Sequence, residues 1–261
     1  MENFTLQRGS VPLLISLPHD GSFIPDGISA RMQPAARRSP DTDWHVGRLY
    51  EPLALQLGAS VLTPHASRYV IDLNRPADGH ALYPGQRETG LVSTIGFDGE
   101  ALYLDACEPD SAEVQQRVNE FWRPYHQALA QEIARLRDQH GRVVLWEGHS
   151  IRSHVPMLFD GRLPDFNLGT AGGASCAEPL QRKLQQRLEQ QSRFSVDVNG
   201  RFKGGYITRH YGNPAAGVQA VQLELAQVNY MDEESYTYDA EKAALVQALI
   251  AELLEASLAL A

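Results

Sequence analysis

Apolar residues in this chain fall into short continuous runs that alternate with longer stretches of helical spacing. Runs typical of buried strands lie at 13–17, 59–63, 69–72 and 143–146, and residues 220–225 alternate between apolar and polar with a period of two. Helical spacing covers 44–57, 111–139, 177–191 and 239–260. Pro124 either bends the second of these helices or begins a new one. Strands that alternate with helices predict an α/β fold with a mostly parallel sheet.

Composition and charge describe one acidic globular domain. The 261 residues are 43% hydrophobic, enough for a sizeable core, and no repeat or linker divides them, so we expect a single domain over 1–261. The formal net charge of -9 makes binding to nucleic acid or to an anionic membrane surface a poor expectation. The apolar runs are strand-sized, the first residues do not resemble a secretory signal, and Cys107 and Cys176 have no CxxC spacing. We therefore expect a reduced cytoplasmic protein without a membrane span.

Polar side chains that can bind a metal ion lie at the ends of three predicted strands. His19 follows the first run, Glu147 and His149 follow the last continuous run, and Glu224 lies near the end of the period-two run. Since open α/β sheets bind ligands at the carboxyl ends of their strands, we expect these side chains to meet. Histidines with a glutamate suit a zinc site with a general base, in which three protein ligands leave a position for water. The alternative is that each histidine is an ordinary core or surface residue.

The third metal ligand is left open by these patterns. Asp41, Asp43 and His45 lie at the start of the helix expected over 44–57. An aspartate at this place also serves as a helix N-cap, and we expect one of the two to do only that. The other aspartate, or His45, is a candidate ligand.

Two cationic segments are candidates for binding an anionic substrate. Arg68 and Arg75 flank the run at 69–72, and Asn74 precedes the second arginine. The planar guanidinium matches a carboxylate, and the alternative is a pair of surface ion-pairing arginines. Residues 199–212 are rich in glycine, aromatic and basic residues. They predict either a loop that folds over an anionic substrate or a solvated basic loop.

Six segments taken together resemble the N-formylglutamate amidohydrolase (N-formylglutamate deformylase) family, which is related in fold to zinc carboxypeptidases and aspartoacylases. They are Pro-His-Asp-Gly (18–21), Asp-Thr-Asp-Trp-His (41–45), Ser-Arg with Asp-Leu-Asn-Arg-Pro (67–76), Glu-Gly-His-Ser (147–150), Gly-Tyr-Ile-Thr-Arg (205–209) and Gln-Leu-Glu-Leu (222–225). The resemblance implies a three-layer α/β/α fold, zinc carboxypeptidase-like or phosphorylase/hydrolase-like. Its sheet is expected to be mixed, mostly parallel and of about eight strands.

The resemblance also implies one zinc ion and its ligands. Carried over to this chain, these are His19, Asp43 and His149. In the relatives the acidic ligand usually follows the first histidine by three residues, where this chain has Ser22. His45 therefore stays a rival of Asp43.

The catalytic residues that the resemblance implies are Glu224, as the general base, and Arg68, which polarises the scissile carbonyl. Glu147 is expected to orient His149. The implied substrate-binding residues are Asn74, Arg75, Tyr206 and Arg209.

The implied substrate is a small dicarboxylate, N-formyl-L-glutamate, and the products are formate and L-glutamate, at the last step of one histidine-degradation route. Two alternatives stay open: a deacylase of another N-acyl amino acid, and a non-catalytic amino-acid-binding module on the same scaffold. The sequence carries no signal for formyl over acetyl selectivity or for oligomeric state.

Overall fold

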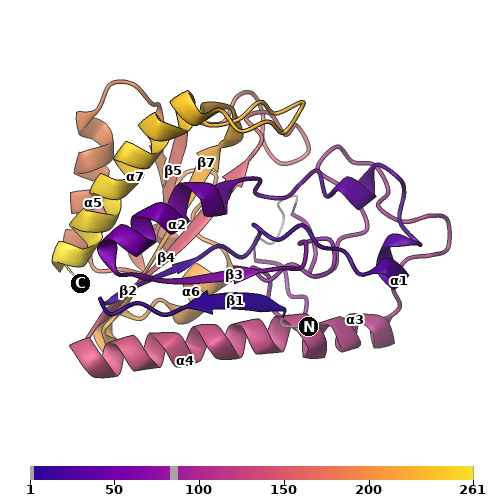
Figure 1. Cartoon of the computed structure of the whole chain (residues 1–261), viewed down its shortest axis with the longest axis horizontal. Helices are drawn as coiled ribbons and strands as arrows, with labels where there is room; N and C mark the ends of the chain where they lie inside the picture. The colour runs from indigo at the N-terminus through magenta and orange to yellow at the C-terminus, as the bar shows by residue number, and fades with distance from the viewer. Residues whose placement is uncertain (1–2, 83–87, 261) are drawn as a thin grey trace.

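The computed structural model describes residues 3–82 and 88–260, and Figure 1 shows a central sheet between two layers of helices. The strands are β1 (Phe4–Gln7), β2 (Leu13–Ser16), β3 (Ser60–Pro64), β4 (Val143–Ile151), β5 (Phe166–Gly169), β6 (Val196–Val198) and β7 (Val218–Ala226). The helices are α1 (Asp26–Ser29), α2 (Val46–Leu57), α3 (Ser111–Arg117), α4 (Arg123–His140), α5 (Glu178–Gln190), α6 (Tyr206–Tyr211) and α7 (Ala240–Leu260). Short 3₁₀ turns lie at Ala36–Arg38, Ala171–Gly173, Pro214–Ala216 and Gln227–Asn229.

The sheet is mixed and mostly parallel, with the strand order β1-β3-β2-β4-β7-β5-β6. Strands β3, β2, β4 and β7 run parallel to one another, β1 pairs antiparallel with β3, and β5 pairs antiparallel with β7 and parallel with β6. This confirms the predicted fold class, with seven strands in the described part of the chain where about eight were expected. The central strands β4 and β7 are the longest, at nine residues each.

Helices α2, α5 and α7 cover one face of the sheet, and α4 and α6 cover the other (Figure 1). Trp146 and Val221 belong to the apolar core on the first face, while Leu145 and Ala220 belong to the core on the second. Neighbouring residues of one strand thus enter opposite cores, as the alternation of side chains along a strand requires.

Among the described helices, α7 is long and apolar enough to cross a membrane by length and composition alone. Its buried side chains include Val246, Ile250 and Leu253, which belong to the core that α7 shares with α2 and α5. This packing is that of a core helix, and it explains the high apolar content without a membrane.

The helix expected over 111–139 is present, and its hydrogen-bonding pattern changes just before Pro124. Helix α3 passes into a π-helical turn at Val118–Trp122, and α4 begins at Arg123 with the proline in its first turn. The neighbouring Arg123 N–H bonds to the Val118 carbonyl oxygen, five residues back, while proline has no N–H and makes no such bond. Pro124 therefore follows a π-helical turn inside one continuous helical run, and it does not begin a separate helix.

Three local predictions need correction. The run at 69–72 forms turns and not a strand: Val70 and Ile71 are buried, but the Val70 N–H bonds back to Ser67. Strand β4 continues to Ile151, so its polar residues lie within the strand and not after it. Helix α6 occupies the second half of the segment expected to be a loop at 199–212. Strands β1, β5 and β6, of three or four residues each, are too short for a periodic pattern to reveal.

Candidate metal centre and active-site cavity

Strands β4 and β7 carry the polar centre of the site on the face covered by α4 and α6. Their register pairs Glu147 with Gln222 and His149 with Glu224, so the four side chains share this face. Earlier in the same strands the corresponding positions are apolar and pack under α4. Each strand is therefore apolar in its first half and polar towards its carboxyl end, where open α/β sheets bind ligands.

Three side chains from distant parts of the chain converge beside these strands. His19 follows β2, Asp43 precedes α2, and His149 lies in β4. One ligand atom from each lies within 4.8 Å of the other two, and all three residues are buried. Asp43 Oδ2 is 2.9 Å from His149 Nδ1 and 3.7 Å from His19 Nδ1. The cluster thus presents a carboxylate between two imidazole nitrogens.

The path of the chain before α2 separates Asp43 from its rivals. The Asp43 N–H donates to the His19 carbonyl oxygen at 3.0 Å, which fixes the aspartate beside the first histidine. His45 points elsewhere, with Nε2 2.8 Å from the Tyr236 carbonyl oxygen. Asp41 accepts from the Tyr69 hydroxyl at 2.6 Å and holds a neighbouring loop.

The expectation that one of these two aspartates only caps α2 is wrong. Neither Asp41 nor Asp43 makes a side-chain cap, because His45 takes a left-handed conformation, with φ of 65°, at the start of the helix. Instead, Asp20 Oδ1 accepts from the Gly47 N–H at 2.8 Å.

A second layer of carboxylates holds both imidazoles. His19 Nε2 donates to Asp72 Oδ1 at 2.7 Å, and His149 Nε2 donates to Glu147 Oε1 at 2.7 Å. Such partners leave each Nδ1 aimed at the centre of the cluster, as in histidine metal sites. Glu147 Oε2 in turn accepts from the backbone N–H, at 3.0 Å, and from the hydroxyl of Thr208 in α6. Glu147 is therefore bonded both to His149 and to α6, which is the position that its predicted orienting role requires.

The electrostatics of the cluster favour a cation. Burial would raise the pKa of Asp43, but His19 and His149 hold it below its ordinary value. Burial and Arg68 lower the pKa of His19. Burial would also lower the pKa of His149, yet hydrogen bonds to Asp43 and Glu147 raise it well above the ordinary value. Buried carboxylate charge is therefore concentrated around the two imidazoles.

The donor set fits a divalent metal ion. Two imidazole nitrogens and one carboxylate oxygen are the ligand types of catalytic zinc sites, which keep a further position for water or substrate. Asp43 Oδ1 supports this fit, because it is buried and has no hydrogen-bond partner among the described residues. Arg68 Nη1 lies 3.7 Å from this oxygen.

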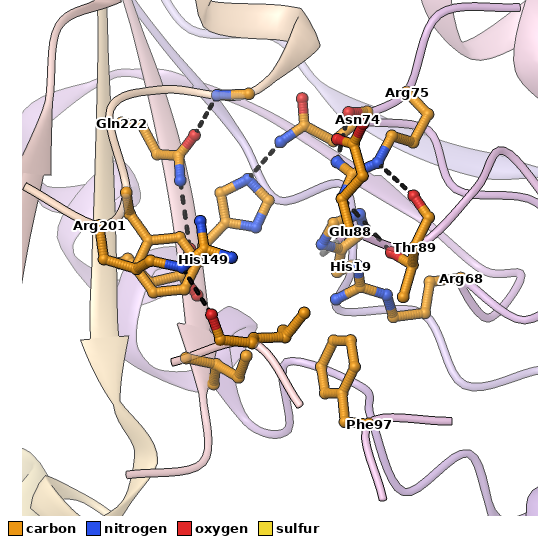
Figure 2. Close-up of a pocket in the computed structure, with 15 residues that line it drawn as sticks. His19, Arg68, Asn74, Arg75, Glu88, Thr89, Phe97, His149, Arg201 and Gln222 are labelled. Carbon is orange, nitrogen blue, oxygen red and sulfur yellow. Dashed lines mark hydrogen bonds between the residues drawn. The ribbon is translucent and has the colours of Figure 1, made fainter. Parts of the chain in front are cut away.

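Figure 2 shows the cavity into which this cluster opens. Its empty volume, including the part that is open to solvent, is about 590 Å³. Its lining includes His19, His149, Glu224, Arg68 and Arg75. The cavity therefore joins the candidate metal centre to two arginines, and Glu88 also belongs to its lining.

Glu224 is 5% exposed and lies on this lining beside His149. The Gln222 amide donates to its Oε2 at 3.1 Å and so orients the carboxyl group. Burial raises the pKa of Glu224 to about 8. A carboxyl group in this environment can accept and release a proton near neutral pH.

Other residues of the protein fix the side chains of Arg68 and Arg75 by hydrogen bonds. Arg68 donates to Asp72 Oδ2 at 2.8 Å, and its guanidinium lies 4.9 Å from the centre of the Phe97 ring. Arg75 donates from Nε to the Thr89 carbonyl oxygen at 2.8 Å. Hydrogen bonds of this kind fix the plane in which each guanidinium meets a ligand.

Asn74 lies between the metal cluster and α6. Its Oδ1 accepts from the Ile207 N–H at 2.9 Å, and its Nδ2 lies 3.1 Å from His149 Nε2. It also lines the cavity. Of the predicted substrate-binding residues, Asn74 and Arg75 therefore reach the cavity.

Tyr206 and Arg209 are not among the residues described as lining the cavity, and their substrate-binding role stays a prediction. Both lie in α6, three residues apart, on the side opposite the buried Ile207 and Thr208. The Tyr206 ring packs 5.8 Å from the Trp122 ring, and Arg209 is exposed. Tyr206 is half-buried against the core beside Trp122, and Arg209 donates from Nε to the Gly204 carbonyl oxygen at 2.8 Å.

Sequence reasoning missed three residues that matter here. Asp72 lies in a segment that the sequence analysis singled out only for its arginines. Its position four residues after Arg68 could have indicated that the two side chains form a pair. Gln222 lies two residues before Glu224 in a strand and so had to share its face. Arg201 lines the cavity, and no local pattern distinguishes it from Arg209.

Comparisons with known proteins agree on one family. A family model described as N-formylglutamate amidohydrolase matches residues 11–231. The chain is 51% identical over 259 residues to an N-formylglutamate deformylase of Pseudomonas aeruginosa, with 99% of this chain and 97% of that protein covered. It is 49% identical over 256 residues to an N-formylglutamate deformylase of Pseudomonas putida, with 98% and 95% covered. A crystal structure of N-formylglutamate amidohydrolase from Ralstonia eutropha matches with a TM-score of 0.82 and 27% identity, over 97% of this chain and 96% of that one.

Proposed function

Because the chain belongs to the N-formylglutamate amidohydrolase family and is an amidohydrolase, we propose that it hydrolyses N-formyl-L-glutamate to formate and L-glutamate with one bound zinc ion. The observation that carries the proposal is the convergence of His19, Asp43 and His149 within 4.8 Å. These three residues hold the ion, which when bound polarises the amide oxygen and lowers the pKa of a water molecule.

Glu224 is the general base of this proposal. It is buried, lines the cavity and is oriented by Gln222. Its carboxylate removes the proton from the attacking water and then passes that proton to the amide nitrogen as the C–N bond breaks. Glu224 in β7 pairs with His149 in β4, and this pairing keeps the carboxylate next to the metal ligand His149.

The arginines of the cavity bind the charged parts of the substrate. Arg68, held by Asp72, faces the formyl oxygen and stabilises the negative charge that develops on it. Arg75 and Asn74 bind the α-carboxylate at the mouth of the same cavity. The two products leave as a one-carbon acid and an amino acid.

We further assign the reaction to the last step of a histidine-degradation route, in the cytoplasm, and to one domain that spans 1–261. Both cysteines are free thiols, as is usual in a reducing compartment. The α-carboxylate subsite and the metal centre are drawn from segments throughout the chain, which supports a single functional unit.

The test compares wild type with Glu224→Gln, a nearly isosteric change that removes the base. We expect the variant to bind one zinc ion per chain, measured by elemental analysis, and to lose about 100-fold or more in kcat for formate release. Glu132→Gln is the matched control, since Glu132 is also buried but bonds to Ser60 and Arg135 away from the cavity.

Two results would contradict the proposal. Near-normal turnover by Glu224→Gln with zinc bound would remove the base assignment. Release of acetate from N-acetyl-L-glutamate as fast as formate from N-formyl-L-glutamate would favour a general N-acyl amino acid deacylase.

A further inference from the structure

The proposed substrate carries two carboxylates, and the cavity offers more cations than one carboxylate needs. Three arginines line it, Arg68, Arg75 and Arg201, although the whole chain has a formal net charge of -9. Arg68 is bound to Asp72 beside the metal cluster, and Arg75 is held at the Asn74 corner. The third arginine, Arg201, has neither the role proposed for Arg68 nor the role proposed for Arg75.

Arg201 lies across the cavity from Arg75, as Figure 2 shows. Its Nε–H donates to the Leu158 carbonyl oxygen at 2.9 Å, which ties the guanidinium to the segment after β4. The guanidinium carbon lies 5.4 Å from the centre of the Phe202 ring, another lining residue. The side chain is half-buried, so its charge is partly withdrawn from solvent and interacts more strongly with a ligand.

The backbone around Arg201 is fixed at both ends. On one side, Asn199 has a left-handed conformation, with φ of 55°, and its Oδ1 accepts from the Thr170 N–H at 2.8 Å. On the other side, the Gly205 N–H donates to Gln222 Oε1 at 2.6 Å, in the floor of the cavity. The segment from β6 to α6 is thereby anchored at both ends, and a fixed backbone favours a fixed contact over a solvated surface position.

We propose that Arg201 binds the side-chain carboxylate of the substrate and so determines the preference for N-formyl amino acids with an acidic side chain. This inference rests on the proposed function and replaces Arg209, which is exposed and outside the described cavity lining. With Arg75 on one wall and Arg201 on the opposite wall, the substrate spans the cavity and its amide lies between them, over the metal centre.

The test measures kcat/KM for two substrates of nearly equal shape, N-formyl-L-glutamate and its neutral analogue N-formyl-L-glutamine. For Arg201→Met we expect kcat/KM to fall by about 10- to 100-fold with the glutamate substrate, the usual value of a charge-assisted contact. With the glutamine substrate we expect a change of less than about threefold, because no charge is lost there. Arg75→Met should lower both values, since both substrates carry the α-carboxylate.

Two further variants guard this result. Arg187→Met, on the exposed side of α5, is the matched control and should alter neither substrate. Arg201→Lys keeps the charge and should lose less selectivity than Arg201→Met. Equal losses in the two variants with both substrates would mean that the arginine acts by packing on Phe202, and they would overturn the proposal.

The remaining outcomes separate the inference from the function on which it rests. An equal fall for both substrates in Arg201→Met, or a selective fall in Arg209→Met instead, would overturn the assignment of Arg201 while leaving the deformylase activity intact. If wild type releases formate from neither substrate, the proposed function itself fails.

Discussion

Acidification is expected to destabilise this protein through one buried histidine of α4. His126 stacks on Trp122, with the ring centres 3.8 Å apart, and is 4% exposed. Its Nε2 donates to the Leu73 carbonyl oxygen at 2.9 Å, so its Nδ1 accepts from the Tyr211 hydroxyl at 3.0 Å. Both ring nitrogens are satisfied in the neutral imidazole. A second ring proton would place a charge in a buried site and would require the Tyr211 hydroxyl to donate to the His126 carbonyl oxygen instead.

The magnitude follows from the difference in pKa between the folded and unfolded states. Burial lowers the pKa of His126 from 6.5 to about 4. Between these values the unfolded chain binds a proton that the folded chain does not, so stability is complete above 6.5 and is lost as the pH falls towards 4. Going from about pH 7 to about pH 5 should cost roughly 2 kcal/mol of unfolding free energy.

The assay is urea unfolding followed by tryptophan fluorescence at the two pH values, with chelator in every sample so that metal binding makes no contribution. Other groups also titrate in this interval, so the quantity to compare is the pH dependence of wild type minus that of His126→Gln. The glutamine has an N–H that can donate to Leu73 but no charge to gain. His140→Gln, an exposed histidine on the same helix, is the matched control.

A clear result would refute this reasoning. If His126→Gln lost as much stability as wild type on acidification, the histidine would not be the group that takes up the proton. A large change of the pH dependence in His140→Gln would likewise show that exposed histidines contribute.

Three further outcomes are expected. Removal of metal by a chelator should abolish formate release and lower Tm, and zinc should restore both; activity that survives complete metal removal would contradict a metal-dependent reaction. Gly205→Ala should reduce kcat/KM by about 10-fold with the fold retained by circular dichroism, because an added Cβ would lie 2.3 Å from Asn74 Nδ2 and displace that side chain. Thr208→Val should weaken zinc binding by about 10- to 100-fold, because Glu147 loses a hydroxyl donor and holds His149 less firmly. Thr208→Ser should restore most of the zinc affinity, measured by competition with a chelating dye, and equal affinities in all three proteins would disprove the link.

Much of the fold could be predicted because the strands and helices that build it follow a local period. The period-two run of β7 indicates which of its side chains share a face, and this period places Gln222 beside Glu224 although the sequence analysis did not single Gln222 out. The continuous apolar run of β4 indicated a strand buried on both faces. It did not show that the strand extends through His149, since glutamate and glycine interrupt the apolar pattern while remaining buried.

The sequence by itself therefore determined the layered α/β architecture, the polar ends of the central strands and the segments that carry the family resemblance. Only the tertiary structure placed Asp43 and not His45 beside the two histidines, gave the bond from Asp20 to the start of α2, and brought Arg201 into the cavity lining. The physical reason is that these choices depend on the path of irregular segments, whose direction is set by left-handed residues and long-range hydrogen bonds. Periodic patterns indicate which face of a strand or helix a side chain occupies. They do not indicate where a residue in a turn lies in the folded protein.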